Sequence, residues 1–276
     1  MKKEVNPMFD LRCKLSERMK NRRAAFLCLL LILFAFNASS AIGAKILFVV
    51  GKKPAVGHKE LRTGDFAIKK HLEGRGLELV IKEDAGVKSE DSEGMDLVIL
   101  SESARSRKIG TKFRDVAVPV ICSEPWIFRD LGMTGRTKKA DFGRQSRQRK
   151  LVIINPDHPL CASCSEKVQV CTKSFFMGWG VPGVHAIAVA GLSRDPHKCT
   201  IFAYDAGVEM PGLVAPAKRV GLFLFRNTPN SFTREGWALF DAAVDWSISG
   251  TQTASKPKMQ TRTGEKSHHP AGSRSF

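Results

Sequence analysis

Three short, continuously apolar runs constrain the fold of this chain more than any other feature. They are KILFVV at residues 45–50, DLVIL at residues 96–100 and VAVPVIC at residues 116–122. Such runs are typical of strands that are buried on both faces, as in a parallel sheet covered by helices. Parallel neighbours need crossover connections, so the sequence predicts an α/β fold with a mostly parallel central sheet and helices on both faces.

Helical spacing appears between and after these runs. Leu61, Ile68 and Leu72 lie on one face of a helix that we expect to end at Gly74 and Gly76. We expect several of the later strands to extend the sheet in antiparallel or mixed fashion. Further strand candidates are residues 77–81, 150–154, 167–171, 185–189, 200–204 and 219–225.

The last predicted element is a helix that Thr233 can cap. Its apolar residues are Trp237, Phe240, Val244 and Ile248, and Gly250 ends it. The rest of the chain is rich in Ser, Thr, Lys and Pro, with too little apolar surface to order itself. We therefore divide the chain into residues 1–44, a globular domain at 45–249, and a disordered basic tail at 250–276.

The first 44 residues have the layout of a secretory signal peptide. Arg22 and Arg23 precede an apolar stretch at residues 24–36, and small residues follow up to Ala44. Met19 would serve equally well as the start. The apolar stretch is shorter than the roughly 20 residues that span a bilayer, so we expect a secreted or periplasmic protein. The uncharged stretch up to Ala44 keeps an uncleaved membrane anchor open as the alternative.

The net charge of +17 is concentrated in three segments. Residues 1–23 carry +5, residues 250–276 carry +4 and residues 136–150 carry +6, which leaves the remaining residues almost neutral. A nucleic-acid binder would carry its basic residues across the folded body. The distribution therefore argues against nucleic acid as the partner.

Five cysteines lie beyond the first 44 residues, namely Cys122, Cys161, Cys164, Cys171 and Cys199. Cys161 and Cys164 have the C-x-x-C spacing of redox and zinc sites. Zinc would need a second tight pair of ligands, which the sequence lacks. We therefore expect structural disulfides or inert thiols and predict no metal. Gly51 follows the first apolar run, but residues 51–59 match neither dinucleotide nor Walker spacing, so we also predict no cofactor.

Taken in order, the motifs resemble those of the ThuA-like (trehalose-utilisation) group of the class I glutamine amidotransferase-like superfamily. The resemblance implies a flavodoxin-like three-layer sandwich and a function with carbohydrate. The motifs are KILFVVG, the Gly64-Asp65 pair, DLVILSES, KFRDVAVPVICSEPWIFRDLGMTG, NPDHPL, WGVPG, IFAYDAG, RVGLFLF and AAVDW.

The sequence departs from the superfamily at the position of the cysteine nucleophile. Glu124 occupies that position, and Cys122 lies two residues earlier, inside the expected buried strand. The glycines that expose a nucleophile on a tight turn are missing as well. Arg226 and Asn227 stand where the resemblance implies a histidine. We therefore expect no glutaminase activity.

Two carboxylates at strand ends are the best candidates for chemistry. Ligands of parallel sheets bind at the carboxyl ends of strands, so Glu102 and Glu124 are expected to face one cleft. Such a pair can serve as acid and nucleophile for glycosides, or hold sugar hydroxyls or a divalent ion. The alternative for Glu124 is a cap for the turn at Pro125. The candidate ligand-binding residues are Gly51, Ser101, Ser103, Ser123, Trp126 and Trp179.

The tryptophans would offer flat faces to a sugar ring, although Trp is often simply part of a core. His158, in NPDHPL, is the third catalytic candidate, as a base, and its alternative is a structural role. We expect His185, in an apolar run, to be a core residue.

The basic run between residues 136 and 150 reads as a solvated loop. Its alternative role is to dock an anionic polysaccharide, which suits an exported protein better than nucleic acid does. Stacking on bases is poorly supported, because Phe142 is the one aromatic residue in the run. The basic residues are Arg136, Lys138, Lys139, Arg144, Arg147, Arg149 and Lys150.

Overall fold

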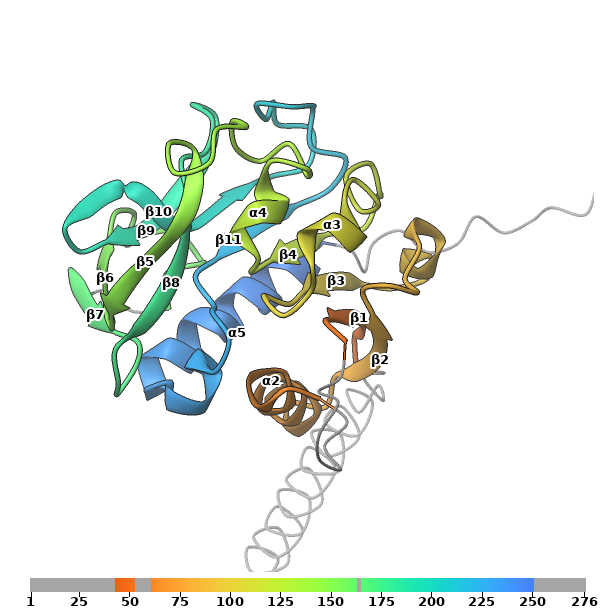
Figure 1. Cartoon of the computed structure of the whole chain (residues 1–276), viewed down its shortest axis with the longest axis horizontal. Helices are drawn as coiled ribbons and strands as arrows, with labels where there is room; N and C mark the ends of the chain where they lie inside the picture. Colours follow the sequence, from red (N-terminus) through yellow and green to blue (C-terminus); the bar gives the residue numbers. More distant parts are fainter. Residues whose placement is uncertain (1–42, 53–60, 163–164, 251–276) are drawn as a thin grey trace, which may run out of the picture. The chain divides into compact units, whose positions relative to one another are not determined.

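The computed structural model of the chain describes residues 43–52, 61–162 and 165–250 (Figure 1). Most of the expected signal segment, the tail beyond Gly250, most of the loop at residues 51–58, and Cys164 lie outside these described residues. Within them, no helix is both long enough and apolar enough to cross a membrane.

Five parallel strands form one half of an 11-stranded sheet, in the order β2–β1–β3–β4–β11. In this half Phe48 of β1 lies beside Ile81 of β2 and Ile99 of β3. The predicted α/β fold with a largely parallel central sheet is thus confirmed. The bounds are β1 Lys45–Val50, β2 Glu78–Glu83, β3 Leu97–Leu100, β4 Val120–Cys122 and β11 Arg219–Leu222.

The other half of the sheet is antiparallel and continues from β11 in the order β10–β9–β6–β7. The long strand β10 also pairs with β8, which in turn pairs with β5. The expected antiparallel extension of the sheet is therefore present. The bounds are β5 Phe142–Gln148, β6 Lys150–Ile153, β7 Lys167–Gln169, β8 Phe175–Gly180, β9 Ile187–Leu192 and β10 Asp195–Tyr204.

Helices cover both faces of the parallel half (Figure 1). Alternate residues of β1 point to opposite faces, so Phe48 packs with α2 and α5, and Val49 packs with α3 and α4. Each face thereby acquires its own apolar core, and the sheet is buried on both sides. The bounds are α2 Thr63–Gly74, α3 Ser106–Ile109, α4 Pro125–Phe128 and α5 Arg234–Ile248, with short 3-10 turns η1 Ser89–Ser92 and η2 Thr228–Ser231.

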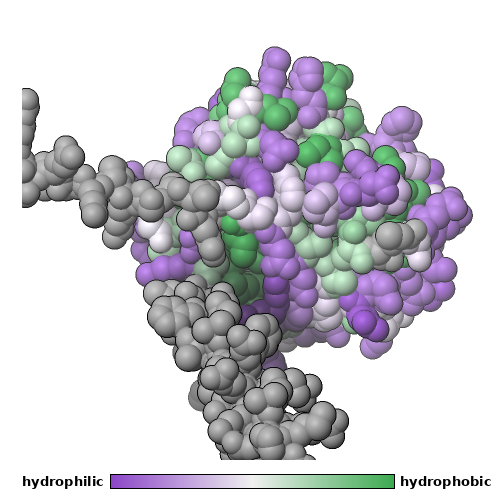
Figure 2. All heavy atoms as spheres, turned by 180° about the vertical axis from the view of Figure 1, so that it is seen from behind, coloured by the Kyte–Doolittle hydropathy of each residue, from purple (hydrophilic) through white to green (hydrophobic). Residues whose placement is uncertain are grey.

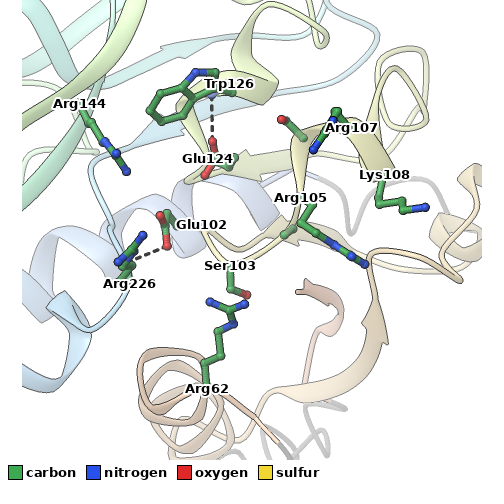
Figure 3. A pocket seen from close by; sticks show the side chains of 12 residues that line it. Arg62, Glu102, Ser103, Arg105, Arg107, Lys108, Glu124, Trp126, Arg144 and Arg226 are labelled. Carbon is green, nitrogen blue, oxygen red and sulfur yellow. Dashed lines mark hydrogen bonds between the residues drawn. The ribbon is translucent and has the colours of Figure 1, made fainter. Parts of the chain in front are cut away.

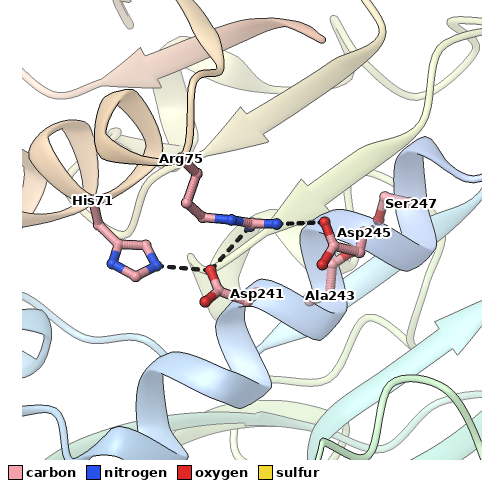
Figure 4. A network of polar contacts seen from close by, with 6 residues as sticks. All are labelled: His71, Arg75, Asp241, Ala243, Asp245 and Ser247. Carbon is pink, nitrogen blue, oxygen red and sulfur yellow. Dashed lines mark hydrogen bonds and ion pairs between the residues drawn. The ribbon is translucent and has the colours of Figure 1, made fainter. Parts of the chain in front are cut away.

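A polar network joins α2 to α5 across this helix pair (Figure 4). Asp241 Oδ1 lies 2.7 Å from His71 Nε2 and accepts a 2.9 Å hydrogen bond from Arg75 Nη1. Arg75 also pairs with Asp245, one turn further along α5. The His71 ring stacks on Trp237 with their centroids 3.9 Å apart. These contacts fix the position of α2 relative to α5 on one face of the sheet.

Three local expectations differ from the structure. Residues 142–148 are not a solvated loop but strand β5, because the fully buried Phe142 anchors its start against the core. His185 is not a core residue, because β9 begins only at Ile187 and the His185 side chain is 59% exposed. Strand β4 is also shorter than the predicted run, since Pro119, which precedes it, has no N–H to donate.

The view from behind shows a mostly hydrophilic surface on which apolar residues lie in small groups (Figure 2). Scattered apolar residues of this kind are normal on a protein surface. The part of this side that is not covered by grey atoms in Figure 2 therefore does not present a broad apolar face. The large apolar residues that are exposed are Phe66, Ile154, Phe176, Val181, Val184 and Val214.

Candidate functional site

A cleft of about 720 Å³ lies where β3, β4 and β11 end in the parallel half of the sheet. The turns that follow these strands supply Glu102, Glu124 and Arg226, and Figure 3 shows both glutamates in its centre. This edge of a parallel sheet is where ligands of α/β proteins bind. The lining residues are Arg62, Glu102, Ser103, Ala104, Arg105, Ser106, Arg107, Lys108, Glu124, Trp126, Arg144 and Arg226.

Glu124 is held at the junction of β4 and α4. It is the N-cap of α4, where its Oε1 accepts a hydrogen bond from Trp126 N at 3.2 Å, and Pro125 begins the helix without needing a donor. The residue is only 7% exposed. Burial, followed by the nearby Glu102 charge, raises the pKa of Glu124 to about 8, against the opposing effects of Trp126 N–H and Arg144.

Glu102 lies in the turn after β3. Its Oε2 accepts a 2.9 Å hydrogen bond from the backbone N–H of Arg226, which joins this turn to the segment after β11. Burial raises the pKa of Glu102 to about 7, although the Arg226 N–H and guanidinium favour its ionised form. Glu102 is therefore the more acidic member of the two.

The two glutamates form a coupled pair. Each uses one carboxyl oxygen to accept a backbone N–H, which leaves Glu102 Oε1 and Glu124 Oε2 without a hydrogen-bond partner among the described residues. The charge on Glu102 is the second cause of the raised pKa of Glu124. Close like charges resist simultaneous ionisation, so near neutral pH the pair holds a proton that it can exchange with a ligand.

Basic side chains surround this pair. Arg144 lies with its guanidinium 5.4 Å from the ring centre of Trp126, 5.1 Å from that of Phe176 and 5.3 Å from that of Phe225. Such cation–π contacts hold an arginine in place without neutralising its charge. The cleft therefore presents a fixed positive charge next to the carboxyl pair.

The other cations of the lining differ in how far they are neutralised. Arg105 pairs with the buried carboxylate of Asp84, at 2.6 Å from Nη2 to Oδ1. Arg62, Arg107 and Lys108 have no ion pair within the described part of the chain. The cleft thus has a surplus of positive charge, which favours a ligand with anionic groups.

A hydrogen-bonded layer supports the cleft from below. Ser101 Oγ donates to Asp65 Oδ1 and accepts from Ser103 N at 3.1 Å, and Gly51 N donates to Ser103 Oγ at 2.9 Å. Asp65 is 4% exposed, and burial raises its pKa. These hydrogen bonds connect three parts of the chain, namely the end of β1, the start of α2 and the turn after β3. They thereby hold in place the backbone of the turn that carries Glu102.

Close backbone contacts also position the cleft. A Cβ on Gly64, in the first turn of α2, would lie 1.9 Å from the carbonyl oxygen of Arg226, and one on Gly51 would lie 2.0 Å from that of Ser103. Only glycine permits these approaches. Each residue of the Gly64-Asp65 pair thus has its own contact. The backbone of Gly64 lies against the Arg226 carbonyl, and the side chain of Asp65 accepts a hydrogen bond from Ser101.

The structure brings most of the predicted site residues to one place. Glu102, Ser103, Glu124 and Trp126 line the cleft. Three others, Gly51, Ser101 and Ser123, are buried at the same strand ends and do not line it.

Trp179 and His158 lie elsewhere. Trp179 of β8 is 4% exposed within the core, so it cannot offer a face to a sugar. His158 follows β6, in the antiparallel half, and its ring centre is 5.7 Å from that of Trp246. Its Nδ1 accepts from Leu160 N at 3.2 Å, and burial lowers its pKa. A structural role fits His158 better than that of a base in the cleft.

Sequence reasoning placed none of the lining arginines at the cleft, although it named Arg144 as a residue that could dock an anionic polysaccharide. Arg105 and Arg226 lie within five residues of the ends of β3 and β11, whereas Arg62 lies directly before α2. The rule that predicted Glu102 and Glu124 would also have predicted Arg105 and Arg226 if it had been applied to cations. Arg144 had no such signal, because it reaches the cleft from β5 in the antiparallel half.

Cys122 lies inside β4 and is fully buried. Its Sγ is 3.5 Å from the carbonyl oxygen of Glu124, and burial raises its pKa well above the ordinary value. A thiol in this state is a poor nucleophile. Among the described residues, no group of three or more His, Cys, Asp and Glu side chains is arranged to hold a metal ion.

The fold and the cleft together define an α/β protein with a carboxyl pair and a basic lining at the carboxyl edge of its parallel strands. No known family profile and no curated protein sequence matches the chain. Among solved structures, it is similar to a Bacteroides uniformis protein provisionally described as ThuA-like, with 11% identity and a TM-score of 0.44, over 78% of this chain and 95% of that one.

Proposed function

We propose that this chain is an exported protein that processes an acidic carbohydrate with Glu102 and Glu124 as its acid–base pair. The observation that carries the proposal is the pair itself, with pKa values of about 7 and about 8 in one cleft. Carboxyl groups tuned to neutral pH in this way are typical of sites that transfer protons. The layout of the first 44 residues supports export.

The different environments of the two carboxyls divide the roles between them. Glu124, with the higher pKa, is protonated at neutral pH and gives its proton to the oxygen of the leaving sugar. Glu102, with the lower pKa, is the carboxylate that accepts a proton from water as the water oxygen bonds to the anomeric carbon. The glycosidic C–O bond breaks, and one water molecule is consumed, as in glycoside hydrolysis by a carboxyl pair.

The basic lining supports an anionic substrate rather than a neutral one. Arg144, Arg226 and Arg62 would bind carboxylate or sulfate groups on sugars that flank the reacting bond. The half-buried Trp126 borders the pair, and its ring already carries the Arg144 guanidinium. A sugar that enters the cleft therefore meets a cation and an aromatic edge together.

The test is turnover of acidic oligosaccharides, such as uronate-containing ones, by the intact protein and its Glu124→Gln and Glu102→Gln variants. We expect the activity of either variant to fall by at least 100-fold, the usual loss when a general acid or base is removed. The wild-type activity should follow a bell-shaped pH profile between the two pKa values of about 7 and about 8. The exposed Glu73→Gln variant on α2 is the matched control.

A non-catalytic carbohydrate-binding domain is the second candidate. It is favoured by the capping role of Glu124, since the Trp126 N–H bond gives this residue a structural reason to be present. Binding of an acidic glycan with no release of product would favour this candidate. Unchanged binding and turnover in Glu124→Gln would reject the cleft as the site in either case.

A further inference from the structure

A second hollow, of about 620 Å³, lies in the antiparallel half of the sheet. One wall is the end of β5 and the start of β6, and the other is the turn between β9 and β10. Ser193 Oγ donates to the carbonyl oxygen of Lys150 at 3.0 Å and so ties the two walls together. We call this hollow the β5–β10 groove. Its lining residues are Gln145, Ser146, Arg147, Gln148, Arg149, Lys150, Leu192, Ser193, Arg194, Asp195 and Lys198.

The charge of the groove is strongly positive and unbalanced. Asp195 is the one acid in the lining, and it is already paired with Lys198 at 2.9 Å. Arg147, Arg149, Lys150 and Arg194 are exposed and have no ion pair with any described residue. Such clustering of like charge costs energy in the free protein, and an anionic ligand would relieve the cost.

Arg147 is held in an unusual backbone conformation. The φ angle of Arg147 is 58°, in the left-handed region that residues other than glycine and asparagine seldom adopt. Arg147 lies where the register between β5 and β8 shifts, between Gln145 and Gln148. A bulge of this kind redirects a side chain out of the regular alternation of a strand.

The described residues contain three non-glycine residues with positive φ, namely Lys139, Arg147 and Arg226. All are basic. Arg226 lines the cleft and Arg147 lines the β5–β10 groove. Backbone strain of this kind concentrates at ligand-binding positions. Lys139 lines neither hollow, but the positive φ of Arg226 and Arg147 coincides with the two basic hollows and separates these two cations from ordinary surface residues.

We propose that the β5–β10 groove binds an anionic polysaccharide through its sulfate or carboxylate groups, separately from the cleft. The cations are distributed over both walls, which suits a polymer with repeated charges better than a single small anion. The neutral residues of the lining, such as Gln145, Ser146 and Gln148, offer partners for sugar hydroxyls. The lining contains no aromatic side chain for base stacking, so a polysaccharide fits it better than single-stranded nucleic acid does.

The experiment measures the affinity of the full chain for a heparin oligosaccharide, with uncharged dextran and a single-stranded DNA oligonucleotide as comparison ligands. The test variant is Arg147→Gln/Arg194→Gln, which removes one cation from each wall. The matched control is Lys70→Gln/Arg234→Gln, which removes the same charge from exposed positions of α2 and α5 that line neither hollow.

We expect the test variant to bind heparin on the order of tenfold more weakly at 0.1 M salt, with the difference shrinking as salt is raised. The control variant should bind as the wild type does. Equal losses in both variants, or unchanged binding in the test variant, would overturn the proposal. Tighter binding of the oligonucleotide than of heparin, lost in the test variant alone, would assign the groove to nucleic acid instead. Failure of the proposed cleft chemistry would appear in a different measurement, the turnover of acidic oligosaccharides by Glu124→Gln, so the two outcomes are distinguished.

Discussion

Glu124 shows how one residue serves the fold and the chemistry together. As N-cap it satisfies the Trp126 N–H, yet its burial and the Glu102 charge keep it protonated at neutral pH. A neutral carboxyl still accepts the capping hydrogen bond through its carbonyl oxygen. The cap and the proton-donor role are therefore compatible.

This protonation predicts how stability depends on pH. The pKa of Glu124 is about 8 in the folded state, against an ordinary value of 4.5, so the folded state binds the proton more tightly. The resulting stabilisation is complete below pH 4.5 and is lost as pH rises through 8. We expect Glu124→Gln to remove most of this loss, on the order of 3 kcal/mol between pH 5 and 8. Urea unfolding at a series of pH values measures the free energy of unfolding of the wild type and of the variant. The same pH dependence in both proteins would contradict the raised pKa of Glu124.

Gly64 carries a second prediction at the residue scale. In Gly64→Ala the new methyl group would lie 1.9 Å from the Arg226 carbonyl oxygen, so α2 or the Arg226 segment must move. We expect a loss of about 1–3 kcal/mol in the free energy of unfolding, as for other overpacked sites. Gly74→Ala is the control, because nothing lies within 4 Å of its Cβ at the other end of the same helix. Equal stability of the two variants would mean that the contact is not tight.

At the scale of elements, the α2–α5 pair makes a prediction about the network in Figure 4. Asp241→Ala removes an acceptor shared by His71 and Arg75, both of which are partly buried. We expect it to destabilise the protein by about 1–2 kcal/mol. Asp245→Ala, which removes only an exposed partner of Arg75, should cost under about 0.5 kcal/mol. Thermal unfolding of both variants compares them, and a larger effect for Asp245→Ala would contradict the assignment.

The parallel elements could be predicted from sequence because their residues carry local signals. The runs at β1, β3 and β4 are apolar on both faces, and Thr233 caps α5 as expected, with its Oγ1 3.1 Å from Gly236 N. Strand β5 carries no such signal, since most of its residues are polar. It is a strand because β8 supplies its hydrogen-bond partners, and this pairing is not local in sequence.

The candidate site, like the fold, could be predicted from sequence only in part. The rule that ligands bind at the carboxyl edge predicted that Glu102 and Glu124 would face one cleft, and both residues line one cleft in the structure, because the rule depends only on strand order. It could not reveal Arg144, whose place next to Trp126 depends on how the antiparallel half folds across the edge of the parallel one. Trp179 was predicted to bind a ligand but lies in the core. The face of β8 on which it lies depends on how β8 pairs with other strands, and the residues next to it in the sequence do not reveal that pairing.

At the scale of the whole molecule, the charge of +17 has a structural meaning. Within the described residues, one group of cations without an ion pair lines the cleft in the parallel half, and another lines the β5–β10 groove in the antiparallel half. Strand β5 contributes to both, through Arg144 and Arg147. Residues 142–148 of the basic run therefore form a strand that contributes cations to two different hollows.

Because the two hollows share a strand, whether they act independently can be measured. Arg144 and Arg147 lie three residues apart, about 10 Å along a strand, and the register shift of β5 separates them. Arg147 has no partner in common with Glu124 among the described residues. We expect the unfolding free energies of Glu124→Gln and Arg147→Gln to add within about 0.5 kcal/mol in the double variant, as for unconnected sites. A larger coupling energy, measured by urea unfolding at pH 7, would mean that β5 transmits strain from the groove to the carboxyl pair, and a polysaccharide in the groove would then alter proton transfer in the cleft.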